Sequence, residues 1–146
     1  MKNCIVAQSG GPTVAINASL SGVIEKAHTS GSYDHIYGSL HGIRGILNND
    51  IICFDDKLED ETFLQALATT PAMYLGSCRY KLPKMADDIE LYEKIFAFFE
   101  ANDITGFFYI GGNDSMDTVL QLSTYAKLHE KSVTIMGVPK TIDNDL

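Results

Sequence analysis

Two pairs of glycines stand where the chain could bind phosphate groups. Gly10 and Gly11 follow one apolar run, Gly111 and Gly112 follow another, and each pair precedes a stretch with helical periodicity. Glycine lets bare backbone N–H groups approach a phosphate, and the helix N-terminus behind them favours negative charge. A single pair of this kind is more often a tight turn without a ligand. Neither pair has GxGxxG or P-loop spacing, so both of those nucleotide sites lack specific support.

Two cations and two carboxylates fall in comparable positions. Arg79 and Lys140 could together hold anionic oxygens, although either one alone is typical of a solvated surface. Asp143 and Asp145 are two residues apart, so in an extended stretch both side chains project to one side. Such a pair suits Mg²⁺ shared with substrate phosphates, or a base that accepts a hydroxyl proton. A polar loop with two capping aspartates is the alternative, but together with the glycine pairs these residues favour phosphoryl transfer.

The hydropathy pattern predicts a regular framework that would position these residues. Apolar runs of strand length alternate with helical stripes, which is typical of a parallel sheet covered by helices. Strands are predicted at residues 4–7, 35–40, 73–75, 106–110 and 133–138, and helices at 14–29, after Asp60 and Glu61 as far as Pro71, at 87–101 and after Gly112. The helix at 87–101 should bury Leu91, Ile95 and Phe98. Residues 42–56 lack clear periodicity and are predicted to form a loop with at most one edge strand.

We therefore expect an α/β fold: a Rossmann-like, mostly parallel sheet flanked by helices, in a single domain over residues 1–146. In an open parallel sheet, ligands bind beyond the carboxyl ends of the strands. The segments 9–13, 76–79, 111–115 and 139–145 each follow a predicted strand. All four should converge on one edge of the sheet.

Composition excludes several functional classes. The 146 residues carry 11 basic and 19 acidic side chains, a net charge of −8, which argues against binding to nucleic acid or to an anionic membrane. Three cysteines, Cys4, Cys53 and Cys78, show no CxxC spacing and indicate neither a disulfide framework nor a zinc knuckle. The first apolar run is too short for a signal peptide or a membrane span, so we expect a cytoplasmic protein. The four histidines, at 28, 35, 41 and 129, have no recognisable ligand spacing and are interpreted as surface groups.

In order along the chain, four motifs resemble those of the phosphofructokinase family. Gly10 to Asn17 resembles its opening phosphate loop, in the form GGPTxxIN that is typical of the diphosphate-using branch. Residues 76–79 resemble its GSxR segment, and residues 111–115 are similar to GGDGS or GGDDS. Residues 139–145 match PKTIDND, which is highly specific. The resemblance runs nearly end to end.

The resemblance implies a role for each matched residue. Asp143 would be the catalytic base toward the sugar's 1-hydroxyl, Arg79 would bridge the transferred phosphoryl group, and Lys140 would anchor the donor. The remaining matched positions would bind the substrates or Mg²⁺: Gly11, Gly112, Ser115, Thr141 and Asp145 as substrate-binding residues, Asn113 as a metal ligand, and Asp114 in both roles. The family commonly has aspartate where Asn113 stands, and an amide oxygen can ligate Mg²⁺ but adds no charge.

Two side chains indicate which phosphoryl donor is used. ATP-using relatives carry glycine at the positions of Asp114 and Lys140. A carboxylate at position 114 would meet the nucleotide's α-phosphate with bulk and like charge, whereas the lysine adds a cation for a short diphosphate. The resemblance thus implies phosphoryl transfer from diphosphate to fructose 6-phosphate, a near-equilibrium reaction of glycolysis and gluconeogenesis. The alternatives are an ATP-dependent 6-phosphofructokinase and a non-catalytic phosphate-binding subunit or fragment.

The chain resembles only the N-terminal portion of that family. Family members continue for more than this length again, and the later part supplies most contacts to the sugar phosphate. We therefore expect residues 1–146 to be the donor-binding part of a longer enzyme, inactive alone and a homo-oligomer when full-length, with diphosphate and fructose 6-phosphate as its partners.

Overall fold

A computed structural model describes residues 2–8, 14–60, 62–69, 75, 83–84 and 86–139. In chain order its elements are β1 (Asn3–Gln8), α1 (Val14–Ser30), β2 (His35–Ser39), α2 (Ile43–Asn48), β3 (Ile51–Cys53), the 3₁₀ helix η1 (Lys57–Glu59), α3 (Phe63–Thr69), α4 (Ile89–Ala101), β4 (Ile104–Gly111), α5 (Asn113–Leu128) and β5 (Thr134–Pro139). None of the helices within the described ranges is long and apolar enough to cross a membrane.

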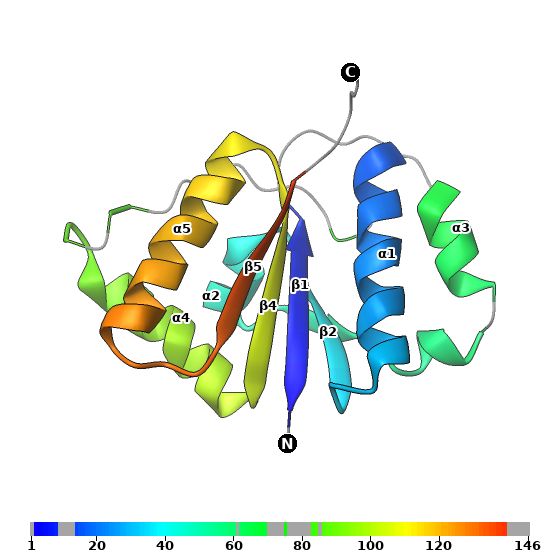
Figure 1. The fold of residues 1–146 in the computed structure, drawn as a ribbon, viewed down its shortest axis with the longest axis horizontal. Helices are drawn as coiled ribbons and strands as arrows, with labels where there is room; N and C mark the ends of the chain where they lie inside the picture. The colour runs from blue at the N-terminus through cyan, green and yellow to red at the C-terminus, as the bar shows by residue number, and fades with distance from the viewer. Residues whose placement is uncertain are drawn as a thin grey trace.

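The strands form one sheet in the order β3-β2-β1-β4-β5. β1 pairs in parallel with β2 and β4, β4 pairs in parallel with β5, and only β3 runs antiparallel, against β2. Helices α1 and α3 lie on one side of the sheet, and α2, α4 and α5 lie on the other (Figure 1). This confirms the predicted Rossmann-like, mostly parallel sheet flanked by helices.

The central strand β1 is buried along its whole length because it has strands on both sides and helices over both faces. Its side chains alternate between two cores. Cys4 and Val6 pack with the residues of α1 and α3, and Ile5 and Ala7 pack with those of α2, α4 and α5. A continuous apolar run in the sequence is thus the signature of a strand covered on both faces.

Helix α4 turns a different face to the core from the one predicted. Its buried residues are Tyr92, Ile95, Phe96 and Phe99, at the spacing i, i+3, i+4 and i+7. The prediction of Leu91, Ile95 and Phe98 was right only at Ile95, since Leu91 and Phe98 are partly buried at the margin of this core. The buried aromatic rings stack against the sheet and α5: Phe96 lies 4.7 Å from the ring centre of Tyr125, and Phe99 lies 5.6 Å from that of Phe107.

Residues 42–56 are more regular than the sequence indicates. They contain helix α2 and the edge strand β3, where a loop with at most one strand was expected. Ile43 and Ile46 of α2 are buried in the core shared with α4, so tertiary packing stabilises a helix of only six residues. Of the strand predicted at 73–75, only Leu75 lies within the described residues, where it occupies a turn.

Two glycines provide a test of how tightly the α1 side of the sheet is packed. A Cβ added at Gly38 in β2 would lie 2.7 Å from Phe54 and 2.8 Å from Leu75, both buried, whereas one added at Gly22 in α1 meets nothing within 4 Å. We predict that Gly38→Ala lowers the free energy of unfolding by about 1–3 kcal/mol through overpacking. Gly22→Ala should raise it by roughly 0.5–1 kcal/mol. Urea unfolding measures the free energy of unfolding of both variants. Equal changes in the two variants would contradict the tight packing around Gly38.

A candidate phosphate-binding edge

Three parallel strands end together at one edge of the sheet. Gln8, the last residue of β1, pairs with Ile110 of β4, and Gly111 pairs with Pro139 at the end of β5. The segments after these strands therefore leave the sheet from neighbouring positions. We call the ends of these three strands, together with Leu75, the carboxyl edge.

Gln8 joins the end of β1 to two other parts of the chain. Its side chain is fully buried; Nε2 donates to Asn17 Oδ1 at 3.2 Å, and Oε1 accepts from the backbone N–H of Leu75 at 2.9 Å. The Leu75 carbonyl in turn accepts from the N–H of His41 at 2.8 Å. Gln8 thus holds Leu75, the residue before the GSxR-like segment, against the end of β1.

Asn17 places the first turns of α1 beside the same strand end. It has no exposed surface, and its partner Gln8 lies two residues before the first glycine pair. Buried amides of this kind are hydrogen-bonded in folded proteins, and here the Gln8–Asn17 bond joins the end of β1 to the first turns of α1. The sequence analysis singled out Asn17 only as part of a motif and did not identify Gln8. The sequence signal that could have identified Gln8 is its position as an amide at the end of an otherwise apolar run.

The second glycine pair opens helix α5 directly at the carboxyl edge. Gly112 is the N-cap residue, with φ −90° and ψ −155°, and having no side chain it cannot cap the helix. Among the described residues, no atom lies within 4 Å of a Cβ added there. The first N–H groups of an α-helix have no partner within the helix, and an anion can satisfy them. Here the backbone arrangement is suited to a phosphate.

The described part of the chain contains some of the predicted site residues. Gly112 and Ser115 are described, and Ser115 is nearly buried, at 4% exposure, in the first turn of α5. Asn113 and Asp114 are the first two residues of α5, although nothing is described of their side chains. The predicted residues that lie outside the described ranges are Gly11, Arg79, Lys140, Thr141, Asp143 and Asp145. Their roles stay predictions, as do those of Asn113, Asp114, Gly112 and Ser115.

What the structure does show is where the four motif segments are attached. Gln8, Leu75, Gly111 and Pro139 each precede or begin one of them, and the strand register and the Gln8 hydrogen bond bring all four residues to the carboxyl edge. Residues far apart in the sequence are therefore linked at one end of the sheet. This is the geometry that a site built from several strand-end loops requires.

Comparison with known proteins gives consistent matches. The phosphofructokinase family model matches residues 3–146. A pyrophosphate–fructose 6-phosphate 1-phosphotransferase of Xanthomonas campestris is 42% identical over 144 residues, and an ATP-dependent 6-phosphofructokinase of Spiroplasma citri is 28% identical over 146. These matches cover 99% and 100% of the chain, but 34% and 40% of the two relatives. The crystal structure of a pyrophosphate-dependent phosphofructokinase from Nitrosospira multiformis superposes with a TM-score of 0.86 at 43% identity, over 99% of this chain and 35% of that one. The chain thus spans about a third of the length of its relatives.

Replacement of Gln8 tests whether the carboxyl edge depends on its amide. We predict that Gln8→Leu lowers the free energy of unfolding by about 1–3 kcal/mol, because it removes the partner of a buried Asn17 amide and of the Leu75 N–H. Lys94→Leu is the control, since Lys94 is exposed on α4 and its replacement should change stability by no more than about 0.5 kcal/mol. The free energy of unfolding of both variants is measured by chemical denaturation. Equal stability of the two variants would show that the Gln8 bonds contribute nothing.

Proposed function

Because this chain belongs to the phosphofructokinase family, we propose that it is the donor-binding, N-terminal portion of an enzyme that transfers a phosphoryl group from diphosphate to the 1-hydroxyl of fructose 6-phosphate. The observation that carries the proposal is the attachment of all four motif segments to the carboxyl edge. The likeness to pyrophosphate-dependent relatives at 42–43% identity supports the same reaction.

In this proposal the protein contributes mainly alignment and charge neutralisation. Asp143 accepts the proton of the 1-hydroxyl as that oxygen attacks phosphorus. An ordinary aspartate has a pKa of about 3.9 and is a weak base, so most of the rate enhancement comes from positioning and from neutralised phosphate charge. Arg79 and Lys140 provide cations for the transferred group and the donor, and the Gly11 N–H binds a donor oxygen. Thr141 and Asp145 contact the substrates.

Helix α5 is the candidate support for the donor and for Mg²⁺. Its uncapped N-terminus at Gly112 favours an anion. Asn113 and Asp114 follow in its first turn, and their amide and carboxylate oxygens are of the type that Mg²⁺ prefers. When bound, Mg²⁺ neutralises phosphate charge. Ser115 is assigned here to the substrate side of the same turn.

Diphosphate is the proposed donor because of residues 114 and 140. Asp114 is the second residue of α5, where glycine in ATP-using relatives would leave room for the α-phosphate of a nucleotide, and its negative charge disfavours that phosphate further. Lys140 directly follows the last residue of β5 and would bind a bare diphosphate in place of the contacts that adenosine makes with a kinase.

The setting proposed for the full-length enzyme follows from the same features. We place it in the cytoplasm as a homo-oligomer that binds neither nucleic acid nor membranes. The net charge of −8 supports the exclusion of polyanionic partners.

A coupled assay of the full-length protein tests the proposal directly. With fructose 6-phosphate and Mg²⁺, we expect turnover with diphosphate and none above background with ATP. Asp143→Ala should lower kcat by about 10²–10⁴-fold, the usual contribution of a general base. Asp87→Ala, an exposed acid ahead of α4, is the control and should keep full activity. Activity unchanged by Asp143→Ala would support a non-catalytic phosphate-binding role instead.

A paired substitution tests the basis of donor choice. Asp114→Gly combined with Lys140→Gly should raise kcat/KM for ATP and lower it for diphosphate, because the first opens space for the α-phosphate and the second removes the diphosphate anchor. The measurement is kcat/KM for both donors in the parent and the variant. Unchanged donor preference would refute the steric and electrostatic argument.

A further inference from the structure

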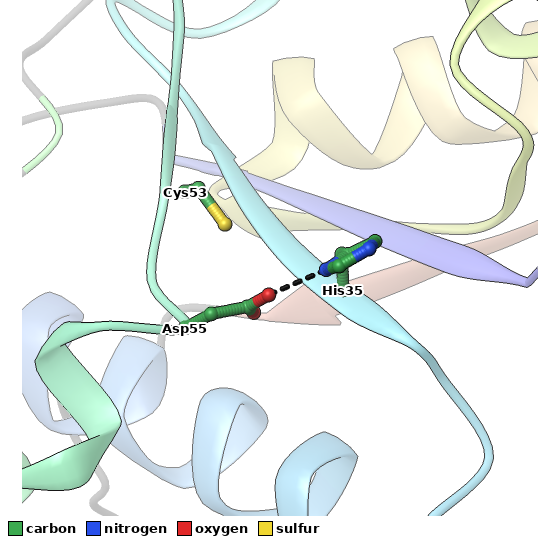
Figure 2. Close-up of side chains that lie close together, drawn as sticks. All are labelled: His35, Cys53 and Asp55. Atoms are coloured by element: carbon green, nitrogen blue, oxygen red, sulfur yellow. Dashed lines mark hydrogen bonds and ion pairs between the residues drawn. The ribbon is translucent and has the colours of Figure 1, made fainter.

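Three side chains of different metal-binding types meet at the amino end of the parallel strands, which is the end opposite the carboxyl edge. They are His35, Cys53 and Asp55, each of which offers one ligand atom within 4.8 Å of the other two. Figure 2 shows the three side chains pointing toward one another, His35 from β2, Cys53 from the end of β3 and Asp55 from the chain that follows β3. His35 begins β2, and β2 is parallel to β1, so this cluster lies at the amino end of the parallel strands.

The strand register explains why these residues meet. In the antiparallel pair β2–β3, Tyr37 lies opposite Cys53, and the Phe54 N–H donates to the Ile36 carbonyl at 2.8 Å, so the pairing continues past the end of β3. The same register places His35 opposite Asp55. Side chains alternate along an extended chain, so Cys53 and Asp55 project to the same face of the β2–β3 pair as His35.

The carboxylate of Asp55 is held in place by its neighbours. Its Oδ2 lies 2.5 Å from His35 Nδ1, and its Oδ1 accepts from the Ile36 N–H at 3.2 Å. Burial opposes ionisation of this carboxyl, but the hydrogen bonds from His35, Ile36 and Cys53 outweigh it and lower its pKa. The ligand atom Oδ2 is thus positioned by a backbone hydrogen bond to the other oxygen, as in many metal sites.

The cluster is also accessible from solvent. The side chains of His35 and Asp55 are 38% and 35% exposed, and Cys53 is exposed. By contrast, Cys4 is buried, and burial together with the charge of Asp55 raises the pKa of its thiol to about 12. Cys53 is therefore the accessible thiol of the described cysteines.

We propose that His35, Cys53 and Asp55 bind a divalent ion of the zinc type. An imidazole nitrogen, a thiolate and a carboxylate together match the preferences of Zn²⁺ and not those of Mg²⁺, which takes oxygen ligands. Zinc bonds of about 2.0–2.3 Å place tetrahedral ligand atoms roughly 3.3–3.8 Å apart. The ligand atoms, which lie within 4.8 Å of one another, must therefore move by about 1 Å to bind the ion. A water molecule would take the fourth ligand position.

Binding has a defined chemical and structural consequence. Although Cys53 is exposed, partial desolvation of its sulfur raises the pKa of the thiol, and the ion replaces the thiol proton, which is released to solvent. The ion also replaces the His35–Asp55 hydrogen bond with bonds that join β2 to the chain after β3. Since β3 is a three-residue strand at the sheet edge, we expect the ion to stabilise this edge. The site is independent of the proposed phosphoryl transfer because it lies at the other end of the strands.

Titration of the full-length protein with Co²⁺ tests the site, because a cobalt–thiolate bond gives a charge-transfer absorption in the near ultraviolet that oxygen and nitrogen ligands do not give. We expect this absorption at one equivalent of Co²⁺, its loss on addition of Zn²⁺, and no loss with excess Mg²⁺. Cys53→Ser should abolish it and weaken Zn²⁺ binding by more than about 100-fold, beyond the effect of losing an outer-shell partner.

Matched variants distinguish a metal site from a simple hydrogen-bonded pair. Asp55→Asn and His35→Gln should each weaken Zn²⁺ binding and reduce the increase in Tm that Zn²⁺ gives the parent protein. Asp56→Asn and His28→Ala, a neighbouring acid and a distant exposed histidine, should leave both unchanged. Circular dichroism establishes that each variant is folded. Absence of the absorption in the parent, its persistence in Cys53→Ser, or its displacement by Mg²⁺ would overturn the proposal.

Discussion

The parallel pairing of β1, β4 and β5 is the constraint on which the rest of this structure depends. It brings Gln8, Gly111 and Pro139 to one edge, although more than a hundred residues separate the first from the second. Parallel strands need a crossover between them, and here helices supply it and cover both faces. This explains why β1 is apolar: it is the central strand, and helices cover both of its faces and exclude water from them. Gln8 is the exception at its end, where a buried amide holds Leu75 and Asn17.

The two ends of the same strands carry different chemistry. At the carboxyl edge, the backbone N–H groups at the start of α5 are of a kind that suits phosphate oxygens. At the amino end, the antiparallel return of β3 places a thiol, an imidazole and a carboxylate together, a set that suits a softer cation. Hard oxygen ligands and a mixed sulfur and nitrogen set select different ions, so the two sites need not compete for the same metal.

The accuracy of the sequence predictions follows from how local each signal is. The strand at 4–7 and the helix at 14–29 were confirmed as β1 and α1, because the first is a short apolar run followed by glycines and the second has an apolar stripe at helical spacing. In α4, six apolar or aromatic residues at 91, 92, 95, 96, 98 and 99 allow two overlapping faces. The choice of Tyr92 and Phe99 depends on Phe107 and Tyr125, which belong to other elements. Helix α2 was missed because its stability comes from the burial of Ile43 and Ile46 and not from helix propensity.

The sequence alone determined the class of the fold, the family and the order of the four motifs along the chain, because hydropathy period and short motifs are properties of neighbouring residues. It also placed three of the four motifs at the ends of strands that the structure confirms, β1, β4 and β5. Only the tertiary structure decided the strand order, the role of Gln8 and the meeting of His35 with Cys53 and Asp55. These depend on which strands pair and in which register. Pairing is settled by contacts between residues distant in the sequence, and the spacing of eighteen residues between His35 and Cys53 carries no sign of it.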